Sequence, residues 1–174
     1  FNEDDIHSLQ GYAAIGHTRY SNTGSSNIAN AQPAVYGQLA VSENGNLTNS
    51  PSLRKELDDK AIFASTIPDG TRCSSDGEII VQTIAAASGD DTFEKIINGC
   101  QKLEGAYTLT ILGKEGLFAA RDPKGFWPLC LGTLNGDGYV VASETISLEF
   151  IGADYIRDVN PGEILSITQD GLKS

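Results

Sequence analysis

The sequence of 174 residues contains no methionine, and it has only one tryptophan, two histidines and three cysteines. Because the chain starts at Phe1 and has no methionine anywhere, we expect it to be part of a longer protein. Cys73, Cys100 and Cys130 lie far apart and form no Cys-x-x-Cys pair. This spacing predicts buried, reduced thiols and argues against a disulfide framework or a zinc cluster.

Positive charge is also scarce. Twelve Lys and Arg residues stand against 23 Asp and Glu residues, which gives a net charge of −11. This charge repels phosphate backbones and anionic lipids, so we expect neither nucleic acid nor a membrane as a partner. No stretch approaches the roughly 20 apolar residues of a membrane span, and the acidic N-terminus lacks the features of a signal peptide. We therefore expect a soluble, cytoplasmic protein.

Short apolar stretches are the main pattern in the sequence. Apolar residues make up 40% of the chain, an ordinary value for a folded domain. Apolar stretches bounded by Gly, Pro, Asn and Asp predict strands. They cover residues 12–19, 39–42, 106–112, 117–121, 129–131, 139–143 and 163–168. Hairpin-length turns at 113–116 and 135–138 favour antiparallel pairing. We expect a single α+β domain over residues 1–174.

Three segments predict helices. The first begins at Ser50, a plausible N-cap, and includes the charged residues 53–60. The second begins at Ser75, with Glu78 three residues later as in a capping box, and its wide apolar face should pack on a sheet. The third begins near Asp91, carries an apolar stripe and ends before Gly105.

Polar residues at the ends of these elements are candidates for a binding site. Arg19 ends a predicted strand, and a guanidinium can bind a carboxylate through two parallel hydrogen bonds. Asn44 and Gly45 follow another predicted strand. There a side-chain amide and a backbone N–H group can donate to one developing oxyanion. Asp76, at the second helix, can accept a hydrogen bond from an ammonium group. Together these groups would hold a free α-amino acid while its side-chain carbonyl is attacked.

Each of these residues also has a plainer interpretation. A strand-end arginine such as Arg19 is more often part of a surface ion pair. Asn44-Gly45 is typical of a type I′ turn, and Asp76 favours the helix dipole. His17 is typical of a structural histidine, and no cysteine has a histidine partner placed by the sequence.

Several motifs, taken together, resemble class II glutamine amidotransferases, and most of all those that make phosphoribosylamine for purine synthesis. The motifs are Gly16-His17-Thr18-Arg19-Tyr20-Ser21, Asn44-Gly45-Asn46-Leu47-Thr48-Asn49, Ser75-Asp76 with Glu78, Arg121-Asp122-Pro123, Ala142-Ser143-Glu144, and Val159 with Pro161-Gly162-Glu163. They occur in order over nearly the whole chain. The resemblance implies a four-layer α/β/β/α sandwich, in which two antiparallel sheets lie between helices, as in N-terminal-nucleophile hydrolases.

The resemblance also implies roles for residues and partners. Glutamine would be the substrate, and ammonia would pass to a phosphoribosyltransferase domain of the same parent protein, where it displaces pyrophosphate from phosphoribosyl pyrophosphate. The glutaminase domain itself would need no cofactor, whereas the parent protein would use Mg²⁺. The sequence does not determine whether the parent also holds an iron–sulfur cluster. The implied site residues are Arg19 for the α-carboxylate, Asp76 for the α-ammonium, Tyr20 and Asn22 in the glutamine pocket, and Asn44 with Gly45 as the oxyanion hole.

The chain departs from the family pattern in three places. The family's nucleophilic cysteine lies upstream of a position corresponding to Phe1, so we expect an N-terminally truncated domain that releases no ammonia by itself. The open sheet edge left by that truncation favours a homo-oligomer or poor order near the N-terminus. Asn22 stands where the family usually has Thr, and Glu43 where it usually has His. A carboxylate at position 43 should oppose an oxyanion at Asn44 unless it points away or is protonated.

Two other functions stay open from the sequence. One is another class II amidotransferase, of the sugar-phosphate or the glutamate synthase type. Tyr20 argues against the sugar-phosphate type, which usually has Trp there. The other is a non-catalytic domain that binds glutamine or mediates assembly, an interpretation favoured by Glu43.

Overall fold

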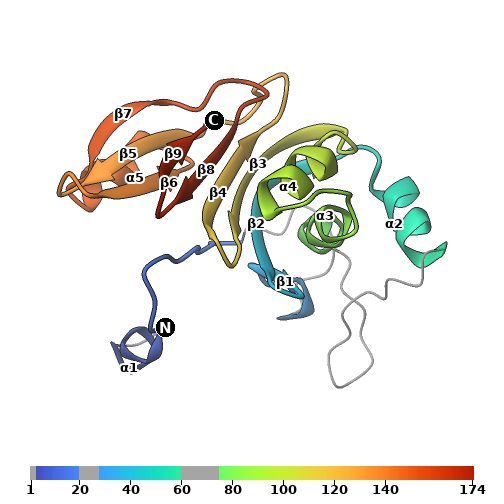
Figure 1. Ribbon diagram of the computed structural model, residues 1–174, viewed down its shortest axis with the longest axis horizontal. Coiled ribbons are helices and arrows are strands. Elements are labelled where there is room, and N and C mark those ends of the chain that lie inside the picture. Colours follow the sequence, from blue (N-terminus) through green and yellow to red (C-terminus); the bar gives the residue numbers. More distant parts are fainter. Residues whose placement is uncertain (1–2, 20–27, 60–74) are drawn as a thin grey trace.

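The computed structural model describes residues 3–19, 28–59 and 75–174. Within these ranges two antiparallel sheets form the centre of the molecule (Figure 1). The larger sheet has the strand order β1 (Ala34–Tyr36), β2 (Leu39–Leu47), β3 (Gly105–Leu112), β4 (Gly116–Arg121), β8 (Ile164–Thr168) and β9 (Gly171–Lys173). The smaller sheet has the order β6 (Gly138–Ala142), β5 (Cys130–Leu134) and β7 (Asp154–Asp158).

Helices lie on the outer faces of the sheets. Their bounds are α1 (Glu3–Ser8), α2 (Ser50–Asp59), α3 (Asp76–Ala85), α4 (Thr92–Cys100) and α5 (Thr145–Phe150), with a short 3₁₀ helix at Ile28–Asn30. Helices α3 and α4 cover the larger sheet, whereas α1 stands apart at the N-terminus (Figure 1). No helix in the described ranges is both long enough and apolar enough to cross a membrane.

The alternation of side chains along β4 separates two cores. Phe118 and Ala120 belong to the larger core, which includes residues of α3 and α4. Ala119, between them, points to the opposite face and packs with Leu131 of β5 and Leu165 of β8. Successive residues of a strand point to opposite faces of the sheet, so the larger sheet has helices on one face and the smaller sheet on the other.

The same alternation on β5 defines the fourth layer. Leu131 faces the larger sheet, whereas Cys130 packs with Leu148 of α5 on the opposite face. The order of layers is therefore helix, sheet, sheet, helix. This confirms the predicted α+β sandwich of two antiparallel sheets between helices.

The structure confirms the predicted capping interactions at only some of the helix N-termini. At α4 the prediction is confirmed, because the Asp91 carboxylate accepts a hydrogen bond from Glu94 N at 2.8 Å and Glu94 Oε2 accepts one from Asp90 N at 2.9 Å. At α3, Ser75 holds the N-cap position, but its side chain makes no capping hydrogen bond. Ser50 is the first residue of α2, and its hydroxyl donates to Asp76 Oδ1 at 2.6 Å.

Two strand predictions are wrong in an instructive way. Residues 12–19 form no strand, and the Tyr12 hydroxyl instead donates to Lys114 O at 3.4 Å. Strand β2 does not end at residue 42, since it continues through Asn44 and Gly45 in register with Thr108 and Tyr107 of β3. The type I′ turn interpretation of Asn44-Gly45 is therefore wrong. The sequence pattern also missed the short strands β1, β7 and β9.

The Arg121-Asp122 motif shapes a loop of the fold. Asp122 is fully buried, and its carboxylate accepts hydrogen bonds from Lys124 N at 2.9 Å and Phe126 N at 3.0 Å. The Arg121 guanidinium donates to the backbone carbonyls of Gly125, Trp127 and Val159 at 2.7 to 3.0 Å. These bonds satisfy backbone groups of a loop that has no strand or helix to pair them.

Replacing Asp122 with Ala is expected to lower the free energy of unfolding by about 2–4 kcal/mol, because the backbone N–H groups of Tyr107, Lys124 and Phe126 lose their acceptor in a buried site. Urea denaturation followed by circular dichroism measures the change. The matched control is Asp137→Ala in the exposed turn between β5 and β6, which should stay within about 0.5 kcal/mol of the wild type. Equal losses in both variants would contradict the structural role of Asp122.

Candidate functional site

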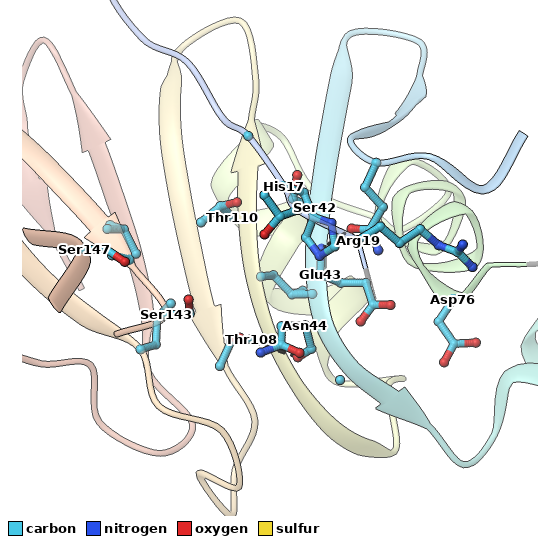
Figure 2. A pocket seen from close by; sticks show the side chains of 18 of the residues that line it. His17, Arg19, Ser42, Glu43, Asn44, Asp76, Thr108, Thr110, Ser143 and Ser147 are labelled. Carbon is cyan, nitrogen blue, oxygen red and sulfur yellow. Dashed lines mark hydrogen bonds between the residues drawn. The ribbon is translucent and has the colours of Figure 1, made fainter. Parts of the chain in front are cut away.

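A cavity of about 410 Å³ opens beside strand β2 (Figure 2). Its walls come from the segment 16–19, from β2 and β3, from the start of α3, and from the region between β6 and α5. The lining includes Arg19, Asn44, Gly45 and Asp76. The structure therefore brings together four of the six residues predicted for the site. The other two, Tyr20 and Asn22, lie outside the described residues.

The cavity exists because β1 is short. Strand β1 pairs with β2 only from Leu39 to Val41, so no strand of the described ranges pairs with the outer edge of β2 after that point. The segment 16–19, Gln32 and the first residues of α3 surround this edge instead. The edge thus offers backbone groups to a ligand, as well as the side chains from both faces of the strand.

Backbone N–H groups along this edge are mostly occupied. Glu43 N donates to Gln32 Oε1 at 2.6 Å, and Leu47 N donates to Asp76 Oδ2 at 2.8 Å. Alternate residues of a strand direct their N–H groups to the same edge, so Gly45 N–H points there too. None of the described residues accepts a hydrogen bond from it. Gly45 therefore presents a backbone donor to the cavity.

Only glycine fits at position 45. A Cβ atom there would lie 2.8 Å from Tyr107 Cα and would overlap the carbonyl of Ala106. The close approach of β2 to β3 at this point excludes any side chain. Glycine is thus required by packing against β3, while its N–H group faces the opposite edge.

The Asn44 side chain leaves β2 on the face that carries Thr108 of β3. It lies directly opposite Thr108 on β3, whose hydroxyl donates to Asn44 O at 3.5 Å. The Asn44 side chain is exposed in the cavity, and Figure 2 shows it beside Thr108. An amide donor and the N–H group of the next residue, Gly45, consequently lie side by side on the cavity wall.

Asp76 ties three elements together at the start of α3. Its Oδ2 atom accepts from Leu47 N, and its Oδ1 atom accepts from the Ser50 hydroxyl, which lies in α2. The side chain is buried, and the helix N-terminus is a favourable place for its negative charge. Each carboxylate oxygen retains a further lone pair. The helix-dipole interpretation and a ligand-binding role are thus compatible.

Charged groups gather at one end of the cavity. Figure 2 shows Arg19, Glu43 and Asp76 at this end, whereas Ser143 and Ser147 lie at the other. The Arg19 side chain is half-buried. An excess of carboxylates beside one guanidinium suits a ligand that carries both a negative and a positive group.

Glu43 leaves β2 on the face opposite to Asn44, because the two residues are neighbours in a strand. Burial, and next the nearby charge of Asp76, raise the pKa of the Glu43 carboxyl to about 7, while Gln32 and Arg19 act in the opposite direction. Burial also lowers the pKa of His17. The Glu43 carboxyl is therefore partly protonated at neutral pH and does not lie between the two donors of Asn44 and Gly45.

Sequence reasoning missed some residues of the cavity. Gln32 holds the backbone of Glu43, and its stretch Ala31-Gln32-Pro33 gave no signal of that role in the sequence. Ser42 and Thr108 line the wall between the sheets, and they resemble any polar residue of a strand in the sequence. No cluster of three or more potential metal ligands occurs in the part of the chain that the structure describes.

The fold and the cavity agree with the comparison to known families. The family described as "Glutamine amidotransferase domain" matches residues 17–149, which is most of the chain. The chain therefore belongs to the class II glutamine amidotransferase domain family.

Its relatives narrow the assignment. The chain is 46% identical to the amidophosphoribosyltransferase of Synechococcus elongatus, over all of this chain and 36% of that protein. It is 41% identical to amidophosphoribosyltransferase 1, chloroplastic, of Arabidopsis thaliana, over all of this chain and 30% of that protein. The chain thus spans about a third of the length of these curated relatives.

A solved structure supports the same grouping. The glutamine phosphoribosylpyrophosphate amidotransferase of B. subtilis, complexed with ADP and GMP, superposes with a TM-score of 0.77 at 35% sequence identity. The match covers 90% of this chain and 33% of that structure. The four-layer sandwich is consequently the fold of the N-terminal-nucleophile hydrolases.

Proposed function

We propose that this chain is the glutaminase domain of an amidophosphoribosyltransferase, which hydrolyses glutamine and supplies ammonia to phosphoribosyl pyrophosphate. The observation that carries the proposal is that Arg19, Asp76 and the Asn44–Gly45 pair line one cavity although they belong to three separate segments. These groups match the α-carboxylate, the α-ammonium and the reacting carbonyl of glutamine.

Binding would use the charged end of the cavity. The Arg19 guanidinium takes the α-carboxylate through charge-assisted hydrogen bonds. Asp76 accepts from the α-ammonium with the lone pairs that Ser50 and Leu47 leave. The side chain of glutamine then extends along β2 toward Asn44 and Gly45.

Catalysis would depend on the two donors at the edge of β2. Attack on the glutamine amide places negative charge on its carbonyl oxygen. The Asn44 amide and the Gly45 N–H group, which both border the cavity, would stabilise that charge by donating hydrogen bonds to the oxygen. Because these hydrogen bonds strengthen as charge develops, they act mainly in the transition state.

The nucleophile is not one of the described cysteines. Cys100 is buried, and burial raises the pKa of its thiol to about 12. The Cys130 thiol donates to Ala142 O at 3.2 Å and packs against α5. Neither residue lines the cavity, so the proposal takes the thiol from a residue outside the described ranges, as the family's N-terminal cysteine implies.

The rest of the reaction belongs to the longer relatives. We infer that ammonia passes to a phosphoribosyltransferase domain, since the curated relatives are about three times as long as this chain. Mg²⁺ bound with phosphoribosyl pyrophosphate, a homo-oligomeric parent and a cytoplasmic location stay predictions.

The test is ammonia release from L-glutamine by the full-length protein. We expect ammonia from glutamine, and pyrophosphate when phosphoribosyl pyrophosphate and Mg²⁺ are added. Replacing glutamine with 4-carbamoylbutanoate, which lacks only the α-amino group, should lower kcat/KM by about a hundredfold, because Asp76 loses its charged partner. Glutamine binding without ammonia release would favour the non-catalytic alternative. If the protein neither binds glutamine nor releases ammonia from it, the proposal is contradicted.

A further inference from the structure

Asp76 alone does not satisfy a bound ammonium group. An α-ammonium group has three N–H donors. The two oxygens of Asp76 already accept hydrogen bonds from Leu47 N at 2.8 Å and Ser50 Oγ at 2.6 Å. One further acceptor position is left on each oxygen, so at least one ammonium N–H requires a different acceptor.

Glu43 carries the other carboxyl group among the described residues that line the cavity. Both Glu43 and Asp76 line the cavity, and Figure 2 shows them at the same end. Among the charged groups around Glu43, Asp76 has a larger effect on its pKa than Arg19 has. Glu43 is therefore close enough to feel the charge of Asp76, the residue proposed to bind the ammonium group.

Gln32 holds Glu43 in this position. The side-chain oxygen of Gln32 accepts from Glu43 N at 2.6 Å, and the Gln32 side chain also hydrogen-bonds the Glu43 carboxyl group. Among the described residues, the charged and titratable groups that face Glu43 are Arg19 and His17 from the segment 16–19, and Asp76 from α3. These groups leave one carboxylate without a matching cation when Glu43 is ionised.

We propose that Glu43 is a second ligand for the substrate's α-ammonium group, acting with Asp76 and fixing the specificity of the cavity for free α-amino acids. The inference rests on the proposed function, since it requires a zwitterionic ligand in the cavity. Glu43 binds in its ionised form, because a carboxylate only accepts hydrogen bonds and carries the charge opposite to that of the ammonium group. Ligand binding therefore releases the proton that Glu43 carries in the empty cavity.

The proposal predicts opposite pH dependences for two matched ligands. A ligand with an α-ammonium group should bind more tightly as the pH rises and Glu43 ionises. A ligand with the carboxylate but no ammonium should bind less tightly over the same range, since ionised Glu43 repels its carboxylate. Because the Glu43 carboxyl has a pKa of about 7, the change should fall between about pH 6 and pH 8.

The probes are methionine sulfone, a glutamine analogue with a methyl sulfone in place of the amide, and 4-(methylsulfonyl)butanoate, the same molecule without the amino group. Neither can be hydrolysed to release ammonia. Calorimetry on the full-length protein gives their dissociation constants at about pH 6 and about pH 8. We expect the amino ligand to bind about tenfold more tightly at the higher pH and 4-(methylsulfonyl)butanoate to bind more weakly there.

Glu43→Gln is the main variant, because it retains the size of the side chain and removes its titration. It should show a change of less than about twofold between the two pH values for either ligand. Glu43→Asp keeps the carboxylate and should restore the pH dependence at a lower affinity. Thermal melting checks that each variant folds.

Three outcomes are decisive. Equal pH dependences for the two ligands in the wild type would overturn the role of Glu43. A dependence that persists in Glu43→Gln would also overturn it, because His17 would then be the titrating group. In both cases binding of the amino ligand would leave the proposed function intact. No binding of the amino ligand at either pH would instead overturn the proposed function.

Discussion

Arg19→Ala is expected to lower kcat/KM for glutamine by about 100- to 1,000-fold in the full-length protein, mostly through KM. The substrate's α-carboxylate would enter a half-buried cavity without its cationic partner, and losing one member of such a pair has a cost in the range of about 2–5 kcal/mol. Asp76 and Glu43, which line the same end of the cavity, would then repel that carboxylate. Steady-state measurement of ammonia release gives both kinetic constants.

Arg19→Lys provides the matched control. Lysine retains the charge but cannot make two parallel hydrogen bonds with a carboxylate, so it should recover only part of the loss. An Arg19→Ala variant with a KM near that of the wild type would show that Arg19 belongs to a surface ion pair and does not bind substrate.

Asn44→Ala is expected to lower kcat by about 100- to 1,000-fold while KM changes little. The effect is typical of removing one donor from an oxyanion hole, because that hydrogen bond gains its strength in the transition state. Gly45 would remain as the second donor, so some activity should persist. Initial rates over a range of glutamine concentrations measure the two constants separately.

Asn98→Ala is a suitable control for this variant. Asn98 is a partly exposed residue of α4 whose amide donates to Ser88 O at 2.8 Å, and it does not line the cavity. Its replacement should leave kcat unchanged. A rise in KM with an unchanged kcat in Asn44→Ala would assign Asn44 to substrate binding and would contradict the oxyanion role.

Local patterns predicted the parts of the fold that depend on local interactions. Helix α4 follows from its apolar stripe and from Asp91 and Glu94, which interact within one turn. Strands β3 and β4 follow from two apolar runs joined by a four-residue turn at 113–116. In both cases the interacting residues are close in the sequence, so their pattern contains the information.

Patterns failed where distant partners decide the structure. Residues 12–19 have the composition of a strand, but a strand also needs a neighbour to pair with, and they pair with none of the described strands. Asn44-Gly45 has the composition of a turn, yet pairing with Thr108 and Tyr107 of β3 keeps it extended. Tertiary contacts outweighed local preference at both places.

For the site, the sequence by itself determined which chemical groups are available: a guanidinium at position 19, an amide next to a glycine at 44 and 45, and a carboxylate at 76. Tertiary structure decided how they meet. The shortness of β1 opens the edge of β2. Asp76 binds that edge through Leu47 N and binds α2 through Ser50 Oγ, both more than twenty residues away in the sequence. Glu43 gains its raised pKa only there, because burial and the charge of Asp76 arise from the folded arrangement and from no property of the residue alone.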